Sequence, residues 1–479
     1  MNAKIINMLK MIGFIALVSL CISFSFKALV YKDTGGGGGF DRLENLPENS
    51  VDVIFFGNSH CHCTVDQGFL WDNYGMAGFT FTAGSQPIDS TASFVEYAVS
   101  IQNPKVIVVE ISGIFADELD SDYVDIYRNL VGMDYSLDYV DRALTMAKSI
   151  GNTFECKFEL LTKYPLVHNR YRELGREDYV LDIPYMMGYK GSMETVPYER
   201  PSVEEWTSSD PISEDVLSQV EKIVDIAKEN NVELVFFAAP LVINQHKQER
   251  YNAFEKYADS NSLLFVNFNN LYDELALDFA TDFRDPDHLN NRGAVKVTSV
   301  LAEKIKSKYK IPDRRGDKKY ILWDMNSRYL QDKSIRNNLS PEVDFNTYMN
   351  AVNLISDRYV SIIRLSGNYM AIPENYSNGL EDCGITREDF SEGGCIIVEN
   401  GKVSKQLTGE YSYCISTPKE EIHIDSKRNR FLIDGVNYEL PDNSIGVIIY
   451  DFELGYLVDV VSVDIYQDGT IVKHPSIDL

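Results

Sequence analysis

Basic residues are scarce in this sequence. Its 479 residues include 45 lysines and arginines against 72 aspartates and glutamates, for a formal net charge of −27 at pH 7. Phosphate groups would repel a chain this acidic, which excludes nucleic acid as a partner. The same charge argues against docking on anionic lipid headgroups and is compatible with a neutral glycan or a small acyl donor. With 44% hydrophobic residues the chain can bury a large core, and it is too long for one ordinary domain.

Cysteine is also scarce, and the count of seven is odd, which argues against a disulfide scaffold. Cys383, Cys395 and Cys414 either contain one bridge or stay free thiols, and the sequence leaves both open. The run His60-Cys61-His62-Cys63 holds zinc-ligand types. Adjacent side chains, however, cannot converge on one ion from a helix, and they split between the faces of a strand. We therefore expect no metal and no cofactor.

Charged residues are missing from Met11 to Phe26, and Lys4 and Lys10 precede this stretch. A secretory signal peptide and a membrane anchor both fit such a run. Extended to Val30, it reaches the roughly 20 residues that a membrane span needs. The sequence thus predicts that residues 1–34 are a cytoplasmic stub and transmembrane signal anchor. The rest of this single-pass cell-membrane protein would then lie outside the cytoplasm.

Five consecutive glycines follow, from Gly35 to Gly39, and such a run is typical of a flexible tether. We interpret 35–49 as a Gly-rich linker. From about residue 50 to 312, short apolar runs alternate with amphipathic stretches, which predicts a three-layer α/β/α domain around a parallel sheet. The predicted strands are 51–56, 78–83, 105–110, 232–239 and 263–268, and the predicted helices are 88–101, one opened by Asp210-Pro211, and 291–308.

Residues 115–209 interrupt this alternation, and they are rich in tyrosine without a clean period. As an insertion on the rim of the sheet, they either form a lid or acceptor groove or only stabilise the domain. After residue 312 the composition changes, and 317–479 are predicted to form a smaller β-rich α+β domain with one helix near 347–355. Its predicted strands are 359–365, 394–399, 431–440, 445–450 and 456–463.

Two short segments carry candidate chemistry. The first, Gly57-Asn58-Ser59, follows the first predicted strand and places a serine hydroxyl at the carboxyl edge of the sheet. A serine needs a neighbouring base to become a nucleophile. The second, Asp285-Pro286-Asp287-His288, lies between the last strand and the last helix of the sheet domain. Its histidine could reach the same edge, with Asp285, or alternatively Asp287, orienting the imidazole ring.

In these two blocks the chain resembles the SGNH (GDSL) hydrolase superfamily. In that family a Gly-x-Ser block follows the first strand and an Asp-x-x-His block precedes the last helix. The resemblance covers about residues 50–310 and implies that Ser59 is the nucleophile, His288 the general base and acid, and Asp285 the orienting carboxylate. It also implies an oxyanion hole built from the amides of Ser59 and Gly84 and one side-chain amide. The family's Asn block is not evident, so Gln86 is the candidate donor, or alternatively a loop residue.

That departure makes the chain similar to the surface-polymer branch of the superfamily, which includes the D-alanyl-lipoteichoic-acid biosynthesis protein and acetyltransferases of exopolysaccharide assembly. The resemblance implies acyl-ester hydrolysis or O-acyl transfer through an acyl-enzyme. The substrate would be a cell-surface glycan or polymer, and a membrane acyl-donor protein would be a partner. The alternative is a non-catalytic glycan-binding protein on a degenerate hydrolase scaffold.

The second domain resembles a different family. Residues 394–401 and the closing hairpin within 446–464 are similar to the interleukin-like EMT-inducer (PANDER-like) domain, and the resemblance extends over about 317–470. It implies a glycan-recognition module. A structural or oligomerising domain is the alternative.

Overall fold

The computed structural model describes the chain in two compact units, which divide between Ser327 and Arg328. The residues outside the description are 1–2, 31–36, 119–128, 134, 150, 164–166, 173, 175–186, 339–343, 354–357, 392–393, 419–420, 427–429, 434, 467–468 and 475–479. Most of them fall in the predicted insertion and in the second unit.

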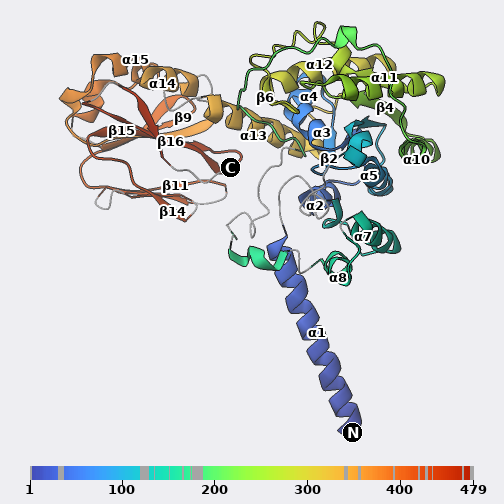
Figure 1. The fold of residues 1–479 in the computed structure, drawn as a ribbon. Helices are drawn as coiled ribbons and strands as arrows, with labels where there is room; N and C mark the ends of the chain where they lie inside the picture. Colours follow the sequence, from blue (N-terminus) through green and yellow to red (C-terminus); the bar gives the residue numbers. More distant parts are fainter. Residues whose placement is uncertain are drawn as a thin grey trace. The chain divides into compact units, whose positions relative to one another are not determined.

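The first unit is organised around strands that are buried on both faces, because most of their residues are apolar. These strands are β1 (Val53–Gly57), β2 (Gly78–Thr82), β3 (Val106–Glu110), β4 (Glu233–Ala238) and β5 (Leu264–Asn267). They form one parallel sheet in the order β2-β1-β3-β4-β5. Figure 1 labels two strands of this sheet, β2 and β4. All five lie close to their predicted ranges, and the predicted α/β class is confirmed.

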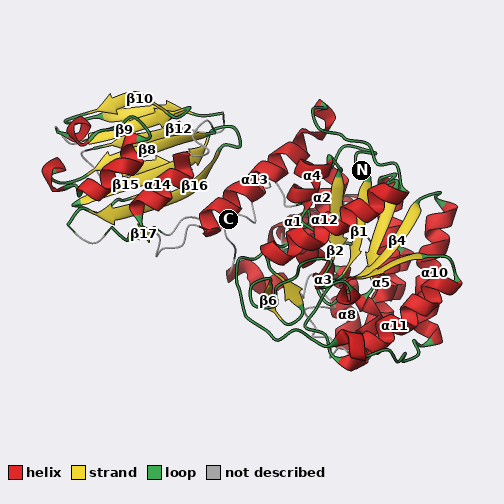
Figure 2. Cartoon of the chain, turned by 90° about the horizontal axis from the view of Figure 1, so that it is seen from above, coloured by secondary structure: helices red, strands yellow, loops and turns green. Residues whose placement is uncertain are grey.

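Helices cover both faces of this sheet, as parallel strands with right-handed crossovers require (Figure 2). On one face, α5 (Ile88–Ile101) contacts β1 and β2, and α10 (Glu214–Glu229) contacts α5 and β4. The crossover from β4 to β5 places α11 (Gln245–Ser260) on this face as well. On the other face, α3 (Ser59–Thr64) and α4 (Gln67–Tyr74) both contact α12 (Asn291–Lys308).

The start of α10 differs from the prediction. Ser213 is the N-cap, and its side chain accepts a hydrogen bond from the Val216 amide. Asp210 instead lies three residues before this cap, where its own amide donates to the Glu249 carbonyl at 3.0 Å. The prediction that Asp210-Pro211 opens this helix was therefore wrong, because Ser213, a residue type equally suited to the N-cap, satisfies the first open helical amides.

The N-terminal segment also differs from the prediction. Helix α1 covers Ala3–Leu29, but among the described residues no helix is long and apolar enough to cross a membrane. The charge-free run ends at Phe26, before Lys27, and is shorter than the roughly 20 residues that a span needs. The prediction of a single-pass cell-membrane protein is therefore wrong.

The predicted linker 35–49 contains a packed helix, α2 (Gly37–Asn45). Phe40 is buried and lies edge-on to Phe81 and Phe94, with ring centroids 4.8 and 5.0 Å away. Leu43 is fully buried in the same core. Burial of these two side chains outweighs the poor helix propensity of the glycines in the first turn.

The insertion 115–209 is described in part. It contains two helices in contact with each other, α7 (Leu137–Ser149) and α8 (Phe154–Thr162). Tyr139 and Leu160, one from each helix, are fully buried in the main core of the first unit. This part of the insertion therefore extends the core, which is one of the two roles left open by the sequence.

The second unit is built from two antiparallel sheets. One has six strands in the order β10-β9-β8-β15-β16-β17, and the other has four strands in the order β11-β12-β13-β14. Side chains of both sheets form a shared core, and helices α14 (Phe345–Asn353) and α15 (Ser377–Glu381) add to a second core on the larger sheet. The strands are β8 (Tyr359–Leu365), β9 (Gly394–Glu399), β10 (Lys402–Leu407), β11 (Ser412–Ser416), β12 (Glu421–Asp425), β13 (Arg430–Ile433), β14 (Val436–Tyr438), β15 (Ser444–Asp451), β16 (Tyr456–Asp464) and β17 (Ile471–Lys473).

Four of the strands expected in this unit lie close to their predicted ranges, because both of their faces are buried and they read as continuous apolar runs. The expected strand 431–440 is instead two strands, β13 and β14. Between them Gly435 has φ of +74°, a conformation that reverses the chain and that glycine adopts without strain. The strands β10, β11, β12 and β17 were not predicted.

Helix α13 (Ile321–Asn338) runs across the division between the units. In its first half, Trp323 is fully buried and donates from its ring nitrogen to the Gly78 carbonyl at 2.9 Å. Five residues later, Arg328 donates to the buried carboxylate of Asp451 at 2.8 Å. Independent folding of the second domain stays a prediction.

We expect the two units to unfold in separate calorimetric transitions, because each has its own core. Ile107→Ala in β3 and Ile448→Ala in β15 remove side chains with no exposed area, at a cost of about 2–5 kcal/mol each. Each substitution should lower only the transition of its own unit, by roughly 5–15 °C. If either variant lowers both transitions together, the units unfold as one.

Candidate functional site

The carboxyl end of β1 places Ser59 at the edge of the sheet. Gly57 ends the strand with φ of +136°, and a Cβ atom there would lie 2.9 Å from the Cβ of Glu110 on β3. Only glycine fits this close approach without strain. Asn58 then caps α3, with its side-chain oxygen accepting from the His60 amide at 2.9 Å. Ser59 is the first residue of this helix and is partly exposed.

A small hairpin presents His288. Strands β6 (Phe283–Asp285) and β7 (His288–Leu289) are antiparallel, and Asp285 lies opposite His288. The Nδ1 atom of His288 is 2.8 and 2.9 Å from the two carboxylate oxygens of Asp285. Because a carboxylate only accepts, Nδ1 carries the proton and Nε2 is the basic nitrogen. That Nε2 is buried and has no hydrogen-bond partner among the described residues.

The second carboxylate of this segment has a different partner. Asp287 lies 3.1 Å from the ammonium of Lys247 on α11. Partial burial opposes ionisation of Asp287, but Lys247 outweighs it, together with the neighbouring histidines, and the pKa of Asp287 is lowered. Of the two carboxylates that the sequence left open as orienting residues, the structure therefore pairs Asp285 with the imidazole.

Ser59 and His288 lie on adjacent elements, since α3 contacts β7. The rings of His60 and His288 pack edge to face with centroids 5.5 Å apart. No hydrogen bond joins Ser59 to His288 within the described part of the chain. Catalytic hydrogen bonds are often long before substrate binds, so this arrangement is compatible with a serine and its base awaiting an acyl group.

Two of the residues predicted for the oxyanion hole, Gly84 and Gln86, lie after β2. The Gly84 carbonyl accepts from the side-chain amide of Asn129 at 3.2 Å, and Gln86 is fully buried. The Gln86 side chain accepts from the Ala83 amide at 2.6 Å and donates to the Thr91 hydroxyl at 3.1 Å. These bonds give Gln86 a clear role in shaping the loop, and none of its described bonds reaches Ser59 or His288. Asn129 was missed because it lies in the insertion, where the sequence shows no periodic pattern.

The histidines beside Ser59 are held as neutral side chains. Burial lowers the pKa of His60 to about 3, with the nearby His288 adding to the effect. Burial also lowers the pKa of His62 well below its usual range, and its Nδ1 lies 2.9 Å from the Thr82 hydroxyl. Among the described residues, His60, Cys61, His62 and Cys63 form no cluster with the mutual distances of metal ligands.

A strap of the insertion crosses the carboxyl edge of the sheet. Residues 187–198, called the strap below, form main-chain hydrogen bonds of 2.7–2.9 Å to β2, α3, the start of α12, β6 and the loop before β6. The Tyr189 hydroxyl also donates to the Asn291 side chain at 2.8 Å. Gly188 is required where the strap passes β2, because a Cβ there would lie 1.8 Å from the Thr80 carbonyl oxygen. The strap therefore forms a fixed wall close to His62 and β6.

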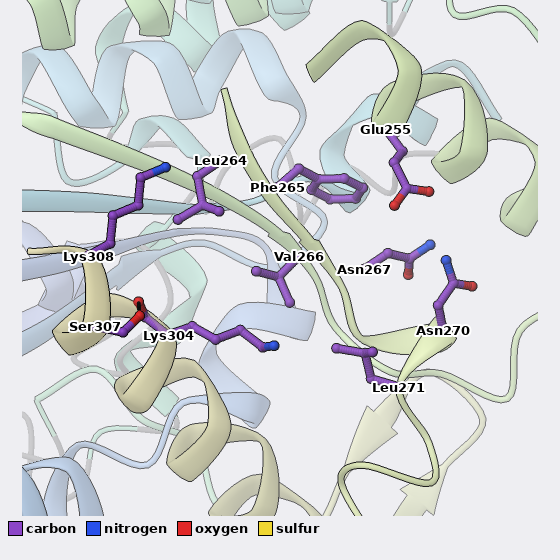
Figure 3. Close-up of a pocket in the computed structure, with 10 residues that line it drawn as sticks. All are labelled: Glu255, Leu264, Phe265, Val266, Asn267, Asn270, Leu271, Lys304, Ser307 and Lys308. Carbon is purple, nitrogen blue, oxygen red and sulfur yellow. Dashed lines mark hydrogen bonds between the residues drawn. The ribbon is translucent and has the colours of Figure 1, made fainter. Parts of the chain in front are cut away.

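A separate hollow of about 390 Å³ lies at the open edge of β5, between α11 and α12 (Figure 3). Figure 3 shows the side-chain amides of Asn267 and Asn270 close to Glu255, with the Lys304 ammonium across the opening. Ser307 already donates to the Lys304 carbonyl at 2.8 Å, as serines in helices often do. This hollow contains no histidine, so we place the candidate chemistry at Ser59 and not here.

Glu110 lies beneath the serine turn as a fully buried carboxyl group. It ends β3 and accepts from the amides of Ser112 and Ala239 at 3.1 and 3.4 Å. Burial raises its pKa from 4.5 to about 7, although these hydrogen bonds act in the opposite direction. The group is thus partly protonated near neutral pH.

This raised pKa predicts a pH-dependent stability difference between the wild type and Glu110→Gln. Since the folded pKa lies above the unfolded one, stability from the neutral carboxyl is complete below about pH 4.5 and is lost as pH rises through about 7. Relative to Glu110→Gln, the wild type should lose roughly 3 kcal/mol between about pH 4 and about pH 8. Denaturant unfolding of the first unit measures it, with the exposed Glu229→Gln as the control that should show no such change. If the stability difference between the wild type and Glu110→Gln is the same at about pH 4 and about pH 8, burial does not raise the pKa of Glu110.

No protein-family model matches the chain, and no curated protein matches it. Among solved structures, the chain is similar to a "putative acylhydrolase" from Bacteroides fragilis, with 13% identity over 57% of this chain and 94% of that one, at a TM-score of 0.27. It is also similar to a GDSL-like lipase from Bacteroides thetaiotaomicron, with 11% identity over 58% of this chain and 100% of that one, at a TM-score of 0.29. TM-scores this low do not establish a shared fold, so the α/β architecture rests on the strand order itself.

Proposed function

We propose that this chain is a serine-dependent acyl-ester hydrolase or O-acyltransferase, with Ser59 as nucleophile, His288 as base and Asp285 as orienting carboxylate. The observation that carries the proposal is the state of His288. One ring nitrogen is held by Asp285, and the other is buried, basic and without a partner among the described residues. The hairpin that bears this ring contacts the helix that begins with Ser59.

In the proposed reaction, His288 Nε2 takes the hydroxyl proton of Ser59 while the serine oxygen attacks the acyl carbonyl. The tetrahedral intermediate collapses to the acyl-serine, and the leaving alcohol receives the proton from His288. Water then releases the free acid, or a sugar hydroxyl accepts the acyl group and gives a new ester. Asp285 stabilises the imidazolium that forms in both steps.

The developing oxyanion needs donors placed before the reaction. The main-chain amides of Ser59 and Gly84 are the proposed pair, because both follow the carboxyl ends of neighbouring strands. Gln86 remains a proposed third donor. Its amide nitrogen has a second hydrogen besides the one given to Thr91, but its bonds favour the loop-forming role.

We further propose a glycan or another hydroxyl-bearing polymer as the substrate and, for the transfer reaction, an acyl-donor protein as a partner. The net charge of −27 disfavours nucleic acid and other polyanions and leaves neutral acceptors.

Carbohydrate binding by the second unit is a separate proposal. A cavity of about 620 Å³ in this unit is lined by aromatic and polar side chains, including Tyr359, Tyr413, Phe452 and Asn400. Aromatic walls with a few fixed polar groups are typical of small-molecule sites. If Ser59 proves inert, binding at this cavity becomes the remaining function, as a non-catalytic glycan-binding protein.

Ser59→Ala and His288→Ala should each lower turnover of an activated acetyl ester by about 10³-fold or more, because either change removes nucleophilic catalysis. The double variant should be hardly slower, since both residues act in one catalytic unit. Asp285→Asn should cost less than Ser59→Ala. Steady-state hydrolysis and covalent labelling by a fluorophosphonate measure these effects.

Two matched controls sharpen this test. Asp287→Asn removes the neighbouring carboxylate that binds Lys247, and His246→Ala removes an exposed histidine on α11. Both should keep turnover within about threefold of the wild type, as expected for groups outside the catalytic unit. Wild-type turnover in Ser59→Ala, in a preparation free of other esterases, would overturn the enzyme assignment.

A further inference from the structure

Three side chains with metal-ligand chemistry meet on the outer face of the smaller sheet. Cys414 on β11 lies directly opposite His423 on β12 in the antiparallel register. Glu421 lies two residues before His423, and alternate residues of a strand share a face. The intervening side chains Ile415 and Ile422 are buried in the core, which confirms that the three exposed groups face outward.

The ligand atoms of these residues already lie near one another. The thiol sulfur, an imidazole nitrogen and a carboxylate oxygen are all within 4.8 Å of each other. His423 Nε2 is 3.7 Å from Glu421 Oε2. This is the one group of three or more such side chains with this spacing among the described residues. We propose that Cys414, Glu421 and His423 form a binding site for a divalent zinc-type ion.

The donor set suits such an ion. Zinc takes sulfur at about 2.3 Å and nitrogen or oxygen at about 2.0–2.2 Å, which puts tetrahedral ligand atoms roughly 3.5 Å apart. Exposed side chains reach that spacing by small rotamer changes, without movement of the paired strands. A thiolate and a carboxylate supply two negative charges, which balance the charge of the ion, and the neutral imidazole adds none.

The thiol is available for this role. Cys414 is free and exposed, so it belongs to no disulfide and is not buried in the core. Desolvation and the nearby Glu421 carboxylate raise the pKa of the Cys414 thiol. The ion must therefore displace the thiol proton, so a proton is released when the ion binds.

With three protein ligands, the fourth position of a tetrahedral ion is open to water or to a ligand atom. The ion would join β11, the edge strand of its sheet, to its antiparallel neighbour β12. Residues Tyr413–Ser416 of β11 also line the cavity of about 620 Å³. Metal binding would thus fix the strand that forms one wall of this cavity. None of this depends on the chemistry proposed at Ser59.

The test uses the full-length protein, stripped with a chelator and titrated with Co²⁺ as a coloured substitute for Zn²⁺. We expect one ion per chain and a thiolate-to-cobalt charge-transfer band. Cys414→Ser should abolish the band, and His423→Ala and Glu421→Gln should each weaken affinity by roughly tenfold or more, as loss of one ligand of three requires. Zn²⁺ should displace the cobalt and bleach the band.

Asp425→Asn and Cys156→Ser are the matched controls. Asp425 is on the same strand and face as His423, two residues further on, and Cys156 is a cysteine of the first unit. Both variants should bind Co²⁺ within about threefold of the wild type, since neither removes a ligand. A band that persists in Cys414→Ser, or that disappears in Cys156→Ser, overturns the site.

Alkylation gives a second, independent measurement. Zn²⁺ should protect Cys414 from iodoacetamide, as peptide mapping reports, and His423→Ala should raise the Zn²⁺ concentration needed for half-protection by roughly tenfold or more. Absence of protection in the wild type at saturating Zn²⁺ overturns the proposal. The thermal transition of each variant without metal shows that it is folded, and ester turnover is expected to be unchanged in the two control variants.

Discussion

The close approach of β1 to β3 at Gly57 is the constraint on which the candidate site depends. A residue larger than glycine does not fit at position 57, because the Glu110 side chain occupies the space that a Cβ atom would need. The chain must turn there, and Asn58 fixes the turn by capping α3. Ser59 consequently emerges at the edge of the sheet at the start of a helix. The atoms of Glu110 that crowd Gly57 are its Cβ and its main-chain carbonyl oxygen, and the carboxyl group of the same residue is buried nearby and costs stability when it ionises above about pH 7.

The sheet and the two short motifs could be predicted from the sequence because their signals are local. Buried parallel strands read as continuous apolar runs, and Asp-x-x-His spacing is visible in four residues. The partners that distinguish the carboxylates are not local. Lys247 lies 40 residues before Asp287, and only the folded chain shows that it binds Asp287 and leaves Asp285 to His288. The strap could not be predicted either, because most of its hydrogen bonds join main-chain atoms, which are the same for every residue type.

In the second unit, the burial of a strand decides whether it could be predicted from the sequence. Strands β8, β9, β15 and β16 are buried on both faces and were visible as apolar runs. In strands β11 and β12, buried isoleucines alternate with exposed polar residues. Each strand has only five residues, so this alternation is too short to predict a strand from the sequence. The register between them cannot be read from the sequence at all. It is this register, Cys414 opposite His423, that brings together three ligand types that are unremarkable when read along the chain.

Three acidic side chains near the serine show how environment separates chemically similar groups. Asp285 is 40% exposed and has both His288 and Arg284 within 3.3 Å, so its charge is compensated where an imidazolium must form. Asp287 is compensated by Lys247 and thereby kept from competing for the imidazole. Glu110 forms no ion pair with any of the described residues, and burial outweighs the more distant charge of Lys247 and favours the neutral form of Glu110. A negative charge is thus held on the side of His288 away from Nε2, while the group beneath the serine turn tends to be uncharged. For the proposed reaction, such an arrangement would favour proton transfer from Ser59 to His288, because the charge that the imidazole would gain is stabilised and the charge that the serine oxygen would gain meets little repulsion from below.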